Sequence, residues 1–128
     1  DLAQALKFLS STQKKKAIVF LISDFMAEDY EHPLKIASKK HDITGIRVYD
    51  IREEKMPNIG MVPMLDAETG MTQLVNTGSK TVRLNYEKYY HDKVTYFKDM
   101  FSKSGSGVVN TRVDENYVTK LLGYFKSR

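Results

Sequence analysis

The most constraining feature of the sequence is an uninterrupted apolar run at residues 17–22, Ala-Ile-Val-Phe-Leu-Ile. A short, β-branched run of this kind is typical of a strand that is buried on both faces of a parallel sheet. The run ends abruptly at Ser23 and Asp24. Such a strand needs a covering layer on each side, so the sequence predicts an α/β fold.

A helix and a second strand follow this run. Pro33 stands in the first turn of a predicted helix over residues 33–40, where a proline costs no hydrogen bond. Residues 43–49 are again rich in β-branched side chains and predict the next strand, which closes on Asp50. Together these elements form a βαβ unit, and we expect its crossover to be right-handed.

Apolar residues at helical spacing predict three more helices. The first covers residues 1–11, and the longest covers residues 79–103. The last begins after Asp114, which we expect to be its N-cap. Both later helices carry stripes that we expect to face inward. The stripes are Val82, Tyr86, Tyr90, Val94, Phe97 and Phe101 in the longest helix, and Tyr117, Val118, Leu121, Leu122 and Phe125 in the last.

A β-hairpin is predicted as an insertion at about residues 60–76. Residues 61–65 and 71–75 flank a five-residue connection that ends in Gly70, and Pro63 indicates an edge strand. A short strand is also predicted over residues 108–113. The sequence thus predicts one domain over residues 1–128, a three-layer, Rossmann-like, mostly parallel sheet with helices on both faces and an inserted hairpin.

Charge and length limit the partners of this domain. The 128 residues include no cysteine, and the net charge of +4 arises from 20 basic and 16 acidic residues that are interleaved. The one basic triplet, residues 14–16, is expected to be a solvated loop before the first strand. No apolar run approaches the ~20 residues that span a bilayer. We therefore expect neither nucleic acid nor membrane contact from this chain.

Four ordered motifs resemble the signature of a known family. They are residues 18–25, residues 41–43, residues 47–50 followed by 52–54 and Pro57, and residues 65–70. This set is similar to the bacterial "domain of unknown function 58" family, whose fold is von Willebrand factor A-like. The resemblance covers nearly the whole chain. It implies that the chain is the carboxy-terminal part of such a domain, truncated at its N-terminus, with an open sheet edge along residues 17–22.

The resemblance also indicates where a divalent ion would bind. In von Willebrand A-like domains three loops supply the ligands, and only an aspartate after a strand has a counterpart here, Asp24. The other ligands would lie upstream of Asp1. We therefore expect no cofactor in this chain, because a Mg²⁺ site would need upstream residues. Asp24 is interpreted chiefly as a loop acid that caps backbone groups.

The candidate ligand or partner surface lies at the ends of the first two predicted strands, where open α/β sheets bind their ligands. It consists of Ser23, Asp24, Asp50, Arg52 and Glu53. The alternation of Arg52 with acids favours a solvated salt-bridge loop over an acid/base pair. A Ser-His-Asp grouping of Ser23 with His41 and Asp42 is disfavoured, because the chain has no Gly-x-Ser-x-Gly turn.

The sequence contains no complete catalytic signature, so we expect a non-enzymatic role. The family resemblance implies an association with MoxR-type AAA ATPases, so we expect a cytoplasmic protein-interaction module that acts as an adaptor for such an ATPase. The resemblance also implies that the parent protein occurs with or without a membrane anchor. We also expect either self-association through the open sheet edge or coverage of that edge by a rearranged segment. The alternative is a Mg²⁺-dependent enzyme or sensor domain whose site needs residues upstream of this chain.

Overall fold

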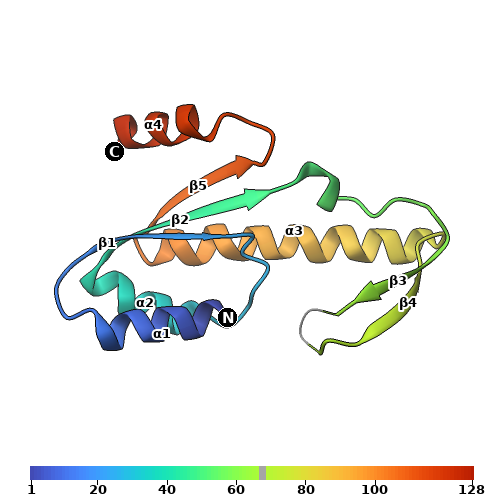
Figure 1. Cartoon of the computed structure of the whole chain (residues 1–128), viewed down its shortest axis with the longest axis horizontal. Helices are drawn as coiled ribbons and strands as arrows, with labels where there is room; N and C mark the ends of the chain where they lie inside the picture. Colours follow the sequence, from blue (N-terminus) through green and yellow to red (C-terminus); the bar gives the residue numbers. More distant parts are fainter. Residues whose placement is uncertain (67–68) are drawn as a thin grey trace. The chain divides into compact units, whose positions relative to one another are not determined.

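The computed structural model describes residues 1–66 and 69–128 (Figure 1). Its elements are, in order, α1 (Leu2–Thr12), β1 (Ile18–Ser23), α2 (Glu31–Lys40), β2 (Asp42–Tyr49), the 3-10 helix η1 (Ile51–Glu53), β3 (Met61–Leu65), β4 (Thr72–Asn76), α3 (Lys80–Lys103), β5 (Gly107–Arg112) and α4 (Tyr117–Ser127). The predicted order of α-helices and strands is confirmed, whereas the 3-10 helix η1 was not predicted.

The chain divides into two compact units. The first comprises Asp1–Asp50 and Asp92–Arg128, and the second comprises Ile51–His91. Helix α3 contributes residues to both units, and the predicted hairpin insertion lies in the second.

The first unit is built on a three-stranded parallel sheet in the order β1-β2-β5 (Figure 1). The register pairs Ile18 with Asp42 and Thr44 with Gly107, so the three carboxyl ends meet at one edge of the sheet. This confirms the predicted α/β class with a mostly parallel sheet flanked by helices. Among the described strands, only β2 pairs with β1, so the predicted open edge of β1 is present.

Helices cover the two faces of this sheet. On one face, Val19 and Leu21 of β1 pack against the hydrophobic core. On the other face, α4 packs on β5, and its Phe125 meets Phe20 of β1 with ring centroids 5.8 Å apart. The core is formed by Leu6, Phe25, Tyr30, Leu34, Ala37, Ile43, Phe97, Met100 and Phe101.

The expectation that β1 is buried on both faces is wrong. Ile18, Phe20 and Ile22 are 68%, 45% and 68% exposed, whereas the alternate side chains are half-buried. The physical reason is that α4 packs over β5 and leaves much of the neighbouring face of β1 uncovered. An apolar run therefore identified the strand correctly but overestimated its burial.

Two expectations about the last helix are also wrong. Tyr117, Val118, Leu122 and Phe125 are exposed, so the apolar stripe does not face inward as a whole. The N-cap is Asn116, whose side chain accepts hydrogen bonds from the backbone N–H groups of residues 118 and 119. Asp114 does not cap the helix and instead forms an ion pair with Arg112.

Gly45 allows α3 to lie close to β2. A Cβ atom at this position would stand 2.5 Å from the ring of Phe101 and 2.8 Å from the ring of Phe97. Both distances are shorter than a van der Waals contact, so a larger residue here would push these core rings away. The carboxy-terminal half of α3 is thereby held against the sheet.

The second unit presents the hairpin of β3 and β4, which pair antiparallel with Val62 opposite Val75. Thr77 closes its base. The Thr77 hydroxyl accepts from the N–H of Ile59 at 3.0 Å and donates to the carbonyl of Gly60 at 2.5 Å. Arg83 then donates to the carbonyl of Thr77 at 2.7 Å. The predicted hairpin is confirmed, and buried hydrogen bonds fix its base.

Candidate functional site

The carboxyl edge of the sheet carries a row of polar side chains. Ser23 ends β1, and the strand registers place it beside Arg47 of β2, which in turn lies beside Asn110 of β5. Partners in register project to the same face of a sheet. The three residues therefore form one row across the strands, at the edge where open α/β sheets bind ligands.

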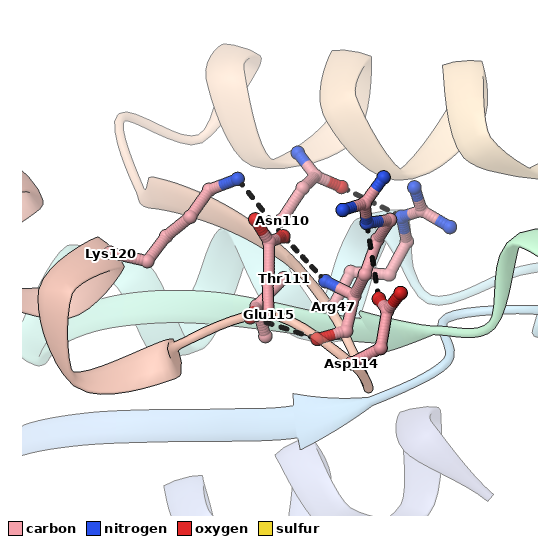
Figure 2. A network of polar contacts seen from close by, with 7 residues as sticks. Arg47, Asn110, Thr111, Asp114, Glu115 and Lys120 are labelled. Carbon is pink, nitrogen blue, oxygen red and sulfur yellow. Dashed lines mark hydrogen bonds and ion pairs between the residues drawn. The ribbon is translucent and has the colours of Figure 1, made fainter.

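Arg47 is the buried cation of this row. Its side chain is desolvated, with the residue only 5% exposed, and its Nε donates to Oδ1 of Asn110 at 2.7 Å (Figure 2). Its guanidinium carbon also lies 4.1 Å from the ring centroid of Tyr49. A buried charge is tolerated when it is hydrogen-bonded in this way. Arg47 was not predicted as a site residue, although a lone cation inside an apolar strand was the available signal.

A second polar network stabilises the turn between β5 and α4 (Figure 2). The carboxylate of Glu115 accepts from the backbone N–H of Arg112 at 2.7 Å and from Nζ of Lys120 at 3.2 Å. Hydrogen bonds from these two donors lower the pKa of the Glu115 carboxyl below its ordinary value. The network therefore holds the turn with Glu115 ionised at neutral pH.

Ser23 and Asp24 both bind the backbone of their own loop. The Ser23 hydroxyl accepts from the N–H of Phe25, and Oδ1 of Asp24 accepts from the N–H of Met26, each at 3.1 Å. This agrees with the interpretation of Asp24 as a capping acid. No group of three or more histidine, aspartate or glutamate side chains that could hold a metal occurs within residues 1–66 and 69–128. A metal role for Asp24 stays a prediction.

The other candidate residues lie further along the chain. Asp50 closes the first unit, whereas Arg52 and Glu53 lie in η1 of the second. The backbone carbonyl of Glu53 accepts from the hydroxyl of Tyr86 at 2.6 Å. Burial, together with the nearby charge of Glu53, raises the pKa of the Tyr86 hydroxyl. The five predicted surface residues are thus divided between the two units.

The strand register excludes a Ser-His-Asp triad. Ser23 lies opposite Arg47, whereas Asp42 lies opposite Ile18, so Ser23 and Asp42 are separated by about 16 Å along the sheet. His41, which directly precedes Asp42, uses its Nδ1 to accept from the N–H of Ala17 at 3.0 Å. These groups stabilise the entry into the strands and cannot act together on one substrate.

A shallow groove lies beside the start of α2. It is lined by Asp29, Glu31, His32, Lys35 and Tyr96. Both acidic and basic side chains line the groove, so its charge does not favour either an anion or a cation. The preceding loop is anchored by an ion pair between Glu28 and Lys93 of α3, and burial lowers the pKa of the Lys93 ammonium.

The hairpin has one strongly apolar and exposed face. Met61, Pro63 and Leu65 of β3 alternate onto the same side as Leu74 of β4, and we call these four residues the hairpin face. Met61, Leu65 and Leu74 are 59%, 69% and 71% exposed. Clustered exposed apolar side chains on a soluble protein mark sites of interaction with other molecules. The sequence predicts the hairpin but not this surface.

Within the described part of the chain there is no helix that is both long and apolar enough to cross a membrane.

Comparisons with known proteins agree with the motif resemblance. The model of a family described as "Protein of unknown function DUF58" matches residues 1–96. The uncharacterized protein MAV169 of Mycobacterium avium is 26% identical over 129 residues, which cover 100% of this chain and 76% of that protein. The uncharacterized protein Rv1480 of Mycobacterium tuberculosis is 31% identical over 74 residues, which cover 57% of this chain and 23% of that protein.

One solved structure also aligns with this chain. It is that of the conserved hypothetical protein BatB from Bacteroides thetaiotaomicron, at a TM-score of 0.43 and 16% sequence identity. The alignment covers 98% of this chain and 57% of the BatB chain.

Proposed function

The chain belongs to the DUF58 family of proteins of unknown function, and from this premise we propose that it is a protein-interaction module, not an enzyme, that acts as an adaptor for a MoxR-type AAA ATPase. The observation that carries the proposal is the exposed, apolar hairpin face. Soluble domains rarely leave a contiguous apolar surface uncovered unless it binds a partner. The choice of an ATPase follows from the family resemblance, and such a partner acts in the cytoplasm.

The hairpin face suits docking for two physical reasons. Its base is fixed by the hydrogen bonds of Thr77, so little conformational entropy is lost when a partner binds. Met61 is unbranched and adapts to the shape of an opposing surface. The face therefore combines a fixed backbone with an adjustable apolar contact.

The polar groups at the carboxyl edge favour binding over catalysis. Nucleophilic catalysis needs a nucleophile within hydrogen-bond reach of a general base, and metal catalysis needs a ligand cluster. Ser23 and Asp24 instead accept hydrogen bonds from the backbone of their own loop. Arg47 is held by Asn110 and by the ring of Tyr49. These contacts stabilise the sheet edge.

The proposal is tested by measuring the binding of this chain to a purified MoxR-type ATPase from the same genome, by biolayer interferometry. Leu74→Lys places a charge in the hairpin face and is expected to weaken binding at least about tenfold, because a buried leucine contributes about 1.5–3 kcal/mol. The matched control is Leu84→Lys, an exposed position on α3 in the same unit, which should bind as wild type does.

Thermal unfolding of both variants checks that each retains its fold. Wild-type chain that does not bind the ATPase, or equal weakening by both substitutions, would contradict the proposal.

A further inference from the structure

Methionine is the oxidisable sulfur residue of this chain. The sequence contains six methionines but neither cysteine nor tryptophan. A peroxide converts a methionine thioether to a sulfoxide, and no thiol of this chain competes for the oxidant. We therefore expect mild oxidation to change this chain at its methionines.

Exposure separates these methionines into two groups. Met61, Met64 and Met71 are 59%, 37% and 65% exposed, whereas Met100 is 8% exposed and the other two are half-buried. The oxidant must reach the sulfur atom, so the three exposed residues should react before the buried one. All three lie within residues 61–71 of the second unit, in or beside the hairpin.

Strand geometry places one of the three on the hairpin face. Met61 belongs to that face, whereas Met64 of the same strand projects to the opposite side, because successive side chains of a strand alternate. Met71 directly precedes β4, and its carbonyl accepts from the N–H of Asp66 at 2.8 Å, which continues the strand pairing. The same alternation directs Met71 away from the side that carries Leu74. Of the three exposed methionines, Met61 alone belongs to the hairpin face.

Oxidation would make Met61 polar. The sulfur lone pair forms a bond to one oxygen of hydrogen peroxide as the O–O bond breaks. The other oxygen takes the proton of the first and leaves as water. Sulfur loses two electrons and the peroxide gains them, so the step needs no further reactant. The product is a sulfoxide, whose S=O group is strongly polar.

This sulfoxide would oppose the docking of a partner on the hairpin face. A partner that covers the face must remove water from the S=O oxygen, and the other three side chains of the face have no hydrogen-bond donor to replace that water. In the free chain Met61 is exposed, so its S=O group stays hydrated. Oxidation should therefore weaken docking without unfolding the hairpin.

We propose that Met61 is a reversible oxidation site, and that its conversion to the sulfoxide by a peroxide prevents docking on the hairpin face. This inference rests on the proposed function. Enzymes of the methionine sulfoxide reductase class reverse the step: two thiols supply two electrons and become a disulfide, and the S=O oxygen leaves as water. Oxidation of Met64 or Met71, which lie off the face, leaves docking unchanged.

Two double variants isolate the sites. Met64→Leu/Met71→Leu keeps Met61 as an exposed methionine, and Met61→Leu/Met71→Leu keeps Met64 instead. Each variant is treated with hydrogen peroxide under conditions that leave Met100 unoxidised, and the peroxide is then removed. Peptide mass spectrometry measures the sulfoxide at each position. Biolayer interferometry measures binding to the purified MoxR-type ATPase, and each treated variant is compared with the same variant untreated.

In the variant that keeps Met61, oxidation should raise the dissociation constant for the ATPase about tenfold or more, because a polar group is buried without a partner. Reduction by the two methionine sulfoxide reductases, one for each sulfoxide epimer, should restore the untreated value. In the variant that keeps Met64, oxidation should leave the dissociation constant unchanged. Circular dichroism should show the same folded spectrum before and after treatment.

Full oxidation of Met61 with an unchanged dissociation constant, or an equal rise in both variants, would overturn this inference and leave the proposed function standing. An untreated Met64→Leu/Met71→Leu chain that does not bind the ATPase would overturn both.

Discussion

The ring of Phe25 stacks on the ring of Phe97, with centroids 4.1 Å apart, although the backbone of Phe25 has a left-handed φ of +55°. A bulky residue adopts this conformation only when its surroundings compensate the strain. Here the compensation is complete burial of the Phe25 side chain in the core of the first unit. The loop that follows Ser23 and Asp24 is therefore anchored to α3.

Removing this anchor should destabilise the first unit strongly. Phe25→Ala is expected to lower the free energy of unfolding by about 3–5 kcal/mol, because it deletes a buried aromatic side chain. Phe125→Ala removes a partly exposed ring from α4 and should cost clearly less. Urea unfolding followed by circular dichroism measures both values. Equal losses for the two variants would show that the loop is not anchored by Phe25.

The stacking of Phe25 also illustrates how far the sequence predicts this fold. Apolar runs and apolar periodicity identified the α-helices and strands of the described residues but not the 3-10 helix η1, because secondary structure of this kind follows local patterns. It could not assign Phe25 to the core, since that contact depends on a left-handed loop residue. It also overestimated the burial of β1 and α4, because apolar character does not reveal whether a covering element is present.

The candidate site was predicted only in part. Ser23 and Asp24 do lie at the carboxyl end of a strand, as the abrupt end of the apolar run indicated. Arg47 was missed because its partner Asn110 is 63 residues away in sequence and is brought beside it only by strand pairing. The exposed hairpin face was missed because exposure depends on tertiary structure.

Gly45 should not tolerate a side chain. Gly45→Ala is expected to destabilise the protein by about 1–3 kcal/mol, because the new methyl group would overlap the rings of Phe97 and Phe101. Gly123→Ala on α4 is the matched control, where a methyl group would meet open space and should stabilise the helix by about 0.5–1 kcal/mol. Chemical denaturation of both variants measures the two changes in unfolding free energy, which should have opposite signs. A neutral Gly45→Ala would contradict the close approach of α3 to β2.

Glu115 should make the protein sensitive to acid. Its folded pKa lies below the ordinary value of 4.5, so its stabilising contribution is fully present above that pH and is lost as the pH falls through the folded pKa. Glu115→Gln should flatten the decline of unfolding free energy with falling pH in this window. Lys120→Met, which removes one of the two donors, should flatten it partly. An unchanged slope in Glu115→Gln would mean that the β5–α4 turn does not depend on this carboxylate.

Thr77 should control the order of the hairpin. Thr77→Val keeps the shape of the side chain but leaves the N–H of Ile59 without its acceptor, a loss of about 1–3 kcal/mol. Amide hydrogen exchange in β3 and β4 should become faster. Thr72→Val makes the same substitution at an exposed position in β4 and should leave these exchange rates unchanged. Equal exchange rates in Thr77→Val and the wild type would show that the hairpin base is held by other contacts.

Millimolar Mg²⁺ should not stabilise this chain. The thermal midpoint is expected to be the same with and without the ion, because the described residues gather no group of three or more carboxylate or histidine side chains that could hold it, and Asp24 alone would leave most ligand positions to water. A ligand that binds only the folded state raises the midpoint, so the measurement is sensitive to specific binding. A Mg²⁺-dependent rise that Asp24→Asn abolishes would establish the metal-dependent alternative.

The central claim, that this chain acts by binding a protein partner through the hairpin face, is tested most directly by hydrogen–deuterium exchange. The exchange of the wild-type chain is compared with and without saturating MoxR-type ATPase. The account predicts slower exchange in β3 and β4, with the other strands unaffected. Binding that slows exchange elsewhere while β3 and β4 stay unchanged would contradict it.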